Sequence, residues 1–87
     1  MHEYHMIERA VQQAIAAAQK SNAMRITKIR IVVGECSGLA PEIISAHFAQ
    51  AAKGTIAEGA ELAIRPVGAY SGQNGHEFYI EDIEVEA

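Results

Sequence analysis

The amino-terminal residues of this chain have the types and spacing that most directly suggest chemistry. The sequence begins Met1-His2-Glu3, and a second histidine follows at position 5. This start brings an α-amino group, the imidazole of His2 and the main-chain amides of His2 and Glu3 close together. Such nitrogens can surround one small divalent cation in a plane, a geometry that suits nickel(II) or copper(II). The opening residues are therefore the first candidate for a metal site.

The spacing of the two histidines adds to this hypothesis, although a simpler interpretation stays open. His2 and His5 are three residues apart, so both would project to one side of a helix that begins this early. Amides in the first turn of a helix have no intrahelical partner and are normally capped or hydrated, but a metal can also bind them. In the simpler interpretation the terminus is frayed and its histidines are solvated.

The other residues with reactive side chains are weaker candidates. Cys36 is the only cysteine, which excludes an intrachain disulfide and a multi-cysteine zinc site. It lies in a glycine-flanked loop with no predicted base beside it, so a half-buried thiol is favoured over a nucleophile. His47 and His76 are expected at the surface or at its boundary with the core, rather than as ligands.

The size and charge of the chain exclude several classes of function. With 87 residues, of which 49% are hydrophobic, the chain is expected to form one globular domain. The formal net charge is −4, and five acidic residues fall between Glu77 and Glu86. This acidity would repel a phosphate backbone, so no nucleic-acid partner is expected. The apolar runs are too short for a bilayer and the start is not signal-like, which predicts a cytoplasmic protein without a membrane partner.

The hydrophobic pattern predicts five elements in the order helix, strand, helix, strand, strand, which is an α+β fold. Two helices on one face of a small three-stranded mixed sheet would bury their apolar stripes. The predicted ranges are 3–20 for the first helix, 25–33 for the first strand, Pro41 to a cap at Lys53-Gly54 for the second helix, and 61–67 and 77–86 for the remaining strands.

The predicted strands differ in where they should lie in the sheet. The first two are joined through a helix and are expected to be parallel. The last two are joined by a short turn-rich segment and should be antiparallel. Pro66 favours an edge position or a strand end, and a change of apolar phase predicts a bulge near Glu81-Asp82.

Each predicted element has one side that should face the core. The residues expected to be buried are Ile7, Val11, Ala14, Ile15 and Ala18 in the first helix, Ile29, Ile31 and Val33 in the first strand, and Ile44, Phe48 and Ala51 in the second helix. Lys28, Arg30 and Val32 are expected on the less buried face of the first strand.

Several segments combine into a pattern that no single one of them defines. They are Met1-His2-Glu3, Ile31-Val32-Val33-Gly34-Glu35 followed by Ser37-Gly38, Pro41-Glu42, the stretch from Lys53 to Leu62, and Ile83-Glu84-Val85-Glu86. In this order the chain resembles the HypA family of hydrogenase nickel-incorporation proteins, which are nickel metallochaperones.

The resemblance implies both a metal and a role. It implies that His2 binds Ni²⁺ together with main-chain nitrogens of the terminus, with Glu3 in a supporting position. It also implies delivery to a hydrogenase large-subunit precursor, or to urease, in cooperation with a nickel-handling GTPase, which is not an enzymatic activity. His5 has no place in the family motif, and its role as an extra ligand is our own inference.

The chain departs from the family pattern at one point. Family members carry a zinc module with two Cys-x-x-Cys pairs between the last two strands, whereas here a short segment, residues 68–75, contains no cysteine. We therefore expect residues 1–87 to form a single nickel-binding domain that holds no zinc. A homodimer formed by exchange of the last strand or of a terminal helix is a further candidate assembly.

An alternative to the metallochaperone is a protein-interaction module with the same fold. Such a module would use an exposed sheet edge or an apolar surface to join a partner or itself. A small enzyme that uses Cys36 or a histidine has the least support.

Overall fold

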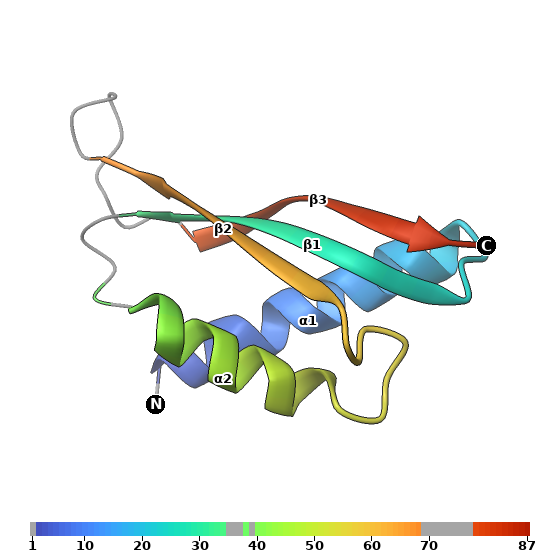
Figure 1. Cartoon of the computed structure of the whole chain (residues 1–87), viewed down its shortest axis with the longest axis horizontal. Helices are drawn as coiled ribbons and strands as arrows, with labels where there is room; N and C mark the ends of the chain where they lie inside the picture. Colours follow the sequence, from blue (N-terminus) through green and yellow to red (C-terminus); the bar gives the residue numbers. More distant parts are fainter. Residues whose placement is uncertain (1, 35–37, 39, 69–77) are drawn as a thin grey trace.

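The computed structural model describes residues 2–34, 38, 40–68 and 78–87, without the side chains of residues 2 and 3. The described part of the chain folds into two helices on one face of a three-stranded sheet (Figure 1). The predicted element order and the α+β class are confirmed. The elements are α1 (His2–Lys20), β1 (Arg25–Gly34), α2 (Pro41–Ala52), β2 (Glu61–Val67) and β3 (Phe78–Glu86).

Strand β1 lies in the centre of the sheet, between β2 and β3. It pairs with β2 in parallel, as predicted, and with β3 antiparallel. The last two strands therefore run in opposite directions, but they do not pair with each other, because β1 separates them. The most apolar strand takes the position with two neighbours, while Pro66 and the charged residues of β2 and β3 lie at edges, where they are tolerated.

The predicted irregularity in β3 is present. Arg30 is opposite Asp82, but the next residue of β1, Ile31, is opposite Ile80, so Glu81 is an extra residue in β3. This bulge explains the change of phase in the sequence, because it lets Ile80 and Ile83 both pack against the core. A second shift in the same pairing lies between Ile26 and Lys28.

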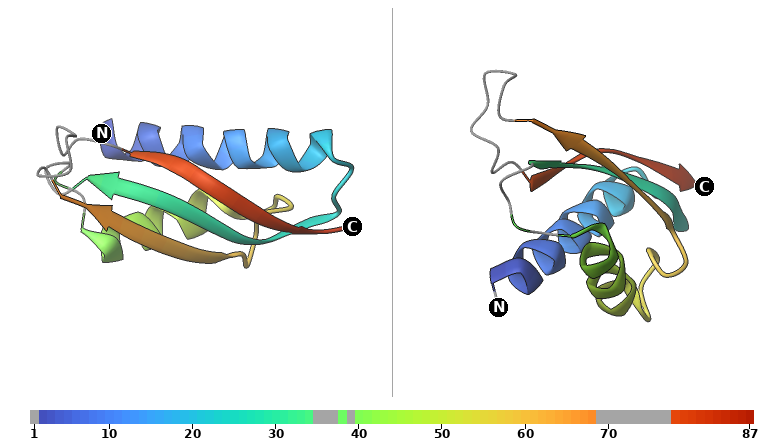
Figure 2. Two further views of the ribbon diagram at one scale, coloured as in Figure 1. Left: turned by 90° about the horizontal axis from the view of Figure 1, so that it is seen from above. Right: turned by 60° about the vertical axis from the view of Figure 1, so that its left-hand side comes forward.

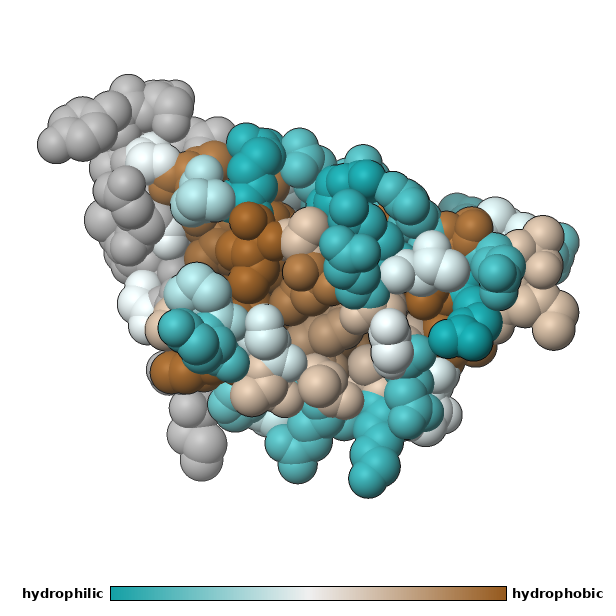
Figure 3. Space-filling model, in the orientation of Figure 1, coloured by the Kyte–Doolittle hydropathy of each residue, from teal (hydrophilic) through white to brown (hydrophobic). Residues whose placement is uncertain are grey.

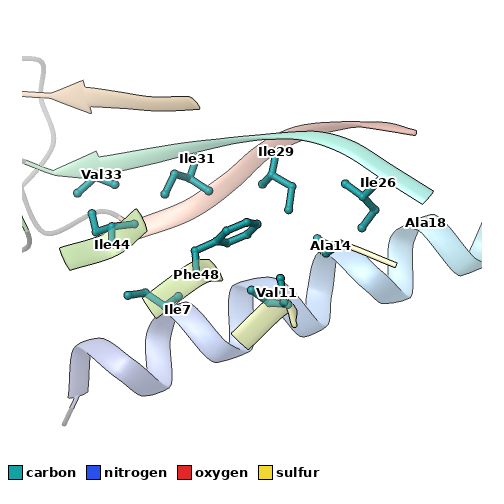
Figure 4. Close-up of a cluster of buried hydrophobic side chains, with 12 residues drawn as sticks. Ile7, Val11, Ala14, Ala18, Ile26, Ile29, Ile31, Val33, Ile44 and Phe48 are labelled. Carbon is teal, nitrogen blue, oxygen red and sulfur yellow. The ribbon is translucent and has the colours of Figure 1, made fainter. Parts of the chain in front are cut away.

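The core fills the space between the sheet and the two helices (Figures 2 and 4). The buried side chains come from α1 (Ile7, Val11, Ala14, Ala18), β1 (Ile26, Ile29, Ile31, Val33), α2 (Ile44, Phe48, Ala52) and the turn after α2 (Ala57). Two details of the sequence prediction were wrong. Ile15 is only partly buried, and Ala52 rather than Ala51 continues the stripe of α2 at four-residue spacing.

The ends of the helices follow local rules that the sequence contains. Helix α1 stops where Asn22 adopts a left-handed conformation, with φ 58°. Helix α2 starts at Pro41, whose missing amide proton costs nothing in the first turn. The chain leaves α2 through Lys53 and Gly54, and Gly54 has φ 80°, so the predicted left-handed cap is confirmed. Among the described residues, neither helix has the length and apolar character of a membrane span.

The face of the sheet opposite the helices carries a row of ion pairs between neighbouring strands. Lys28 Nζ lies 3.6 Å from Glu61 Oε2 of β2. On the other side, Arg30 donates to Asp82 at 2.6 Å and also to Glu84. Hydrogen bonds to Asp82 and then to Glu84 raise the pKa of Arg30 above its ordinary value. These exposed pairs set strand register more than stability.

One ion pair spans the whole sheet. Arg65 of β2 donates from Nε and Nη2 to the two carboxylate oxygens of Glu81 in β3, at 3.2 and 2.9 Å. Because β1 lies between these strands, the pair crosses over β1. Val32 of β1 lies opposite Arg65 in the pairing of β1 with β2. The sequence placed Val32 on the less buried face of β1, but its side chain is fully buried.

The central position of β1 leads to a stability prediction. Ile29 is 1% exposed and lies between the helices and both neighbouring strands. Ile29→Ala should lower the free energy of unfolding by about 2–5 kcal/mol, because it leaves a cavity in the core. The matched control is Ile43→Ala in α2, where the same side chain is 47% exposed and the loss should stay below about 1 kcal/mol. Urea denaturation followed by circular dichroism measures both; equal losses would contradict this account of the core.

Candidate metal-binding site

The first turn of α1 contains the predicted ligands. The helix begins at His2, one residue earlier than the sequence predicted, so the expectation of an early start is confirmed. The main-chain amides of His2 and Glu3 consequently belong to the first turn, where an α-helix supplies no carbonyl partner for them. The start of α1 lies at the end of the domain where β1 finishes and α2 begins (Figure 2). The helix thus leaves these amides available to another ligand.

The structure describes the side chain of only one of the other predicted ligands, His5. His5 is exposed on α1, and positions 2 and 5 are three residues apart on the same helix, which makes them neighbours on its surface. Met1 and the side chains of His2 and Glu3 lie outside the described part of the chain. The coordination predicted for them therefore stays a prediction.

A contact between two aromatic rings fixes the first turn of α1 against α2. The rings of Tyr4 and His47 meet edge to face, with centroids 5.2 Å apart and an interplanar angle of 66°. Both residues are partly buried, so the boundary position predicted for His47 is confirmed. His47 Nδ1 is buried and has no hydrogen-bond partner among the described residues. Sequence analysis missed this contact, because no local pattern relates residues so far apart in the chain.

The remaining candidates do not form a second site in the part of the chain that the structure describes. Cys36, His76 and residues 69–75 of the predicted linker lie outside that part. Among the described residues, no group of three or more His, Cys, Asp or Glu side chains is close enough to hold a metal ion.

Comparison with known proteins identifies the family. Residues 1–72 match the family model described as hydrogenase/urease nickel incorporation, metallochaperone, hypA. This match includes the first turn of α1, the central strand β1 and most of the remaining fold. The chain therefore belongs to the HypA family of nickel metallochaperones.

Individual relatives support the same assignment. The chain is 38% identical to hydrogenase maturation factor HypA of Picosynechococcus sp. over 88 residues, which covers 99% of this chain and 78% of the relative. It is 29% identical to the HypA of Caldanaerobacter subterraneus subsp. tengcongensis, covering 99% of this chain and 100% of the relative. A solved structure titled "Solution structure of HypA protein" has the same fold, with a TM-score of 0.79 at 18% identity, covering 98% of this chain and 96% of that chain.

The chain is shorter than several of these relatives. It spans 62% of the HypA of Pyrococcus abyssi, to which it is 33% identical. The alignment with the Caldanaerobacter protein is 114 positions long, and the present chain has 87 residues, so at least 27 positions are gaps in this chain. The absence of an inserted zinc module between β2 and β3 stays a prediction.

The contact between Tyr4 and His47 can be measured as a coupling energy. In a double-mutant cycle, Tyr4→Ala and His47→Ala should be non-additive by about 0.5–1.5 kcal/mol in the free energy of unfolding, as edge-to-face ring pairs are. The control cycle pairs His47→Ala with His5→Ala, because His5 is exposed on the same helix. A coupling equal to that of the control cycle would show that the rings do not hold the first turn.

Proposed function

We propose that this chain is a nickel-binding metallochaperone domain that takes part in nickel insertion into [NiFe]-hydrogenase, or into urease. The observation that carries the proposal is the start of α1 at His2, in a chain that belongs to the HypA family. This start leaves the amides of His2 and Glu3 without helical partners, next to an imidazole. The same residues are the ones that a planar nitrogen site would use.

The proposed ligands are four nitrogens of the terminus. They are the imidazole of His2, the main-chain nitrogens of His2 and Glu3, and the amine of Met1. Glu3 supports the site with its carboxylate, and His5 is an additional candidate ligand one turn further along the helix. Nickel(II) is the cargo of this domain and not a resident cofactor, and no zinc is expected.

Electrostatics favours ligation by deprotonated amides. The amino-terminal end of a helix carries a partial positive charge, which opposes the binding of a bare cation by about 0.3–1 kcal/mol. Two amides that lose their protons to nickel each add a negative charge at this end, and together they neutralise the charge of Ni²⁺. A site made only of neutral imidazoles would keep the full repulsion. The helix end therefore suits the planar site better than loose binding by histidines.

The position of the site suits transfer of the metal. The ring contact of Tyr4 anchors the first turn of α1 on α2, and the proposed ligands precede this anchor or lie on the solvent side at His5. A metallochaperone must hold nickel and then release it to another protein. We propose that the receiving partners are a hydrogenase large-subunit precursor and a nickel-handling GTPase, and that residues 1–87 act as a non-enzymatic carrier.

The main alternative is an interaction module that does not bind nickel. The open edge of β2 is the observation that favours it, since an unpaired edge can accept another strand. The two functions differ in whether the isolated chain binds nickel at its terminus.

A nickel titration of the untagged protein tests the proposed ligands. His2→Ala should weaken nickel binding by more than about tenfold, because it removes a ligand, and the loss of a group that only orients a ligand already costs about 10–100-fold. One alanine inserted before Met1 should also weaken binding, because it moves the amine away from the imidazole of His2. The control is Gln19→Ala, an exposed residue at the other end of α1. Isothermal titration calorimetry measures all four proteins; unchanged affinity in both terminal variants would refute the site.

The protons released on binding make the nickel affinity depend on pH. Imidazole must be neutral and two amides must lose protons, so affinity should fall steadily as the pH is lowered from about 8 to about 6, through the usual histidine pKa near 6.5. Over the same range, the visible absorption band of planar diamagnetic nickel should disappear. A nearly colourless octahedral spectrum at pH 8 would instead indicate loose binding by histidines.

A further inference from the structure

A hollow between α1 and the start of β3 combines apolar side chains with one positive charge. Its volume is about 250 Å³. β3 begins beside the amino-terminal half of α1 (Figure 2), and both elements line the hollow, with the residues Met6, Arg9, Ala10, Gln13, Phe78 and Tyr79. Met6, Ala10 and Phe78 are partly buried, whereas the other three are exposed. The hollow therefore has an apolar interior and a polar rim.

The charge of Arg9 has no partner in the described part of the chain. The residues one turn before and after it on α1 are His5, Met6, Gln12 and Gln13, and none of them is acidic. Arg9 forms no ion pair with another described residue. Its planar guanidinium is thus free to bind a carboxylate through two parallel hydrogen bonds.

The acidic residues of β3 do not balance Arg9, because they already have partners. Glu81 is held by Arg65 of β2, and the next acidic residue, Asp82, is held by Arg30 of β1. Their charges are therefore matched on the open face of the sheet. An anion that approaches the start of β3 meets Arg9 as the unmatched charge.

Other hollows at the surface contain charges of both signs. The hollow of about 540 Å³ between α2 and β2, on the side that shows an apolar band along β2 (Figure 3), is lined by both Lys53 and Glu58. A wider hollow beside the second half of α1 is lined by Arg25 and again by Glu58. An anion would be repelled by Glu58 in either place. Among the described residues that line the hollow beside Arg9, none is acidic.

A second polar group lies next to Arg9 on the same side of α1. Gln13 is four residues after Arg9, and its side-chain amide can donate a hydrogen bond to the same carboxylate. Met6, Arg9 and Gln13 follow position 2 by four, seven and eleven residues, so all four positions form one stripe on the helix. The hollow consequently opens on the side of α1 that includes position 2.

We propose that this hollow binds a small organic acid. The carboxylate lies on Arg9 and Gln13, and an apolar body packs against Met6, Ala10 and Phe78. The volume is below the roughly 300–1,000 Å³ of pockets for drug-sized ligands, which limits the ligand to about the size of an amino acid. The proposal does not rest on the proposed nickel function, and its test uses metal-free buffer containing a chelator.

Phenylacetate is the probe, because it joins one carboxylate to one apolar ring. In two-dimensional amide NMR spectra of the isotope-labelled chain, it should cause saturable shifts at Ala10 and Phe78, with a dissociation constant of about 1 mM. Phenylacetamide lacks the charge and acetate lacks the ring, so each should bind at least roughly tenfold more weakly. Equal binding of phenylacetamide, or shifts confined to residues outside the hollow, would overturn the proposal.

Three variants test the two halves of the hollow. Arg9→Gln removes the charge and should weaken phenylacetate binding by roughly tenfold or more. Ala10→Leu keeps the charge but occupies the space of the ring, and should remove saturable binding. The matched control is Arg25→Gln, an exposed arginine beside Glu58, which should leave binding unchanged within about twofold. Circular dichroism verifies that each variant is folded. No saturable binding by the wild-type chain, or an equal loss in the two arginine variants, would contradict the assignment.

Discussion

The burial of β1 between two strands and two helices is the constraint on which the rest of the domain depends. Ile26, Ile29, Ile31 and Val33 point to the helices, and Val32 is fully buried on the other face. A strand buried to this extent must have neighbours on both sides, because its main-chain groups have no water to bond with. It therefore separates β2 from β3 and turns both into edges. The bulge at Glu81, the charged rows of the edge strands and the placement of the helices all follow from this arrangement.

The same packing fixes the position of the start of α1, where the proposed ligands lie. The stripe from Ile7 to Ala18 fixes the helix on the sheet, and the ring contact of Tyr4 with His47 extends this attachment into the first turn. The attachment stops just where the proposed ligands begin. The proposed carrier role would use such a division, with the packed helix as a rigid body and the proposed ligands at its beginning. The proposed nickel site rests on two observations, membership of the HypA family and the start of α1 at His2.

The two faces of the sheet differ in burial, and its two edge strands differ in charge. Its covered face supplies stability, and its open face supplies a row of alternating charges that sets the register of the strands. β3 is protected from further pairing by its acidic residues, which is a common device at sheet edges. β2 has charges of both signs, Glu61 and Arg65, on either side of the apolar residues Leu62, Ala63 and Ile64.

The sequence by itself determined the elements, their order and much of the core, because helix and strand periodicity, the Pro41 start, the Gly54 cap and the phase change in β3 are local signals. It also singled out His2 and Glu3 through their types and their resemblance to the HypA family. Only the tertiary structure decided that β1 separates the last two strands, that Val32 is buried under the crossing of Arg65 and Glu81, and that Tyr4 meets His47. These features join residues that are distant in the chain, and their energies depend on which surfaces meet, which no local pattern records.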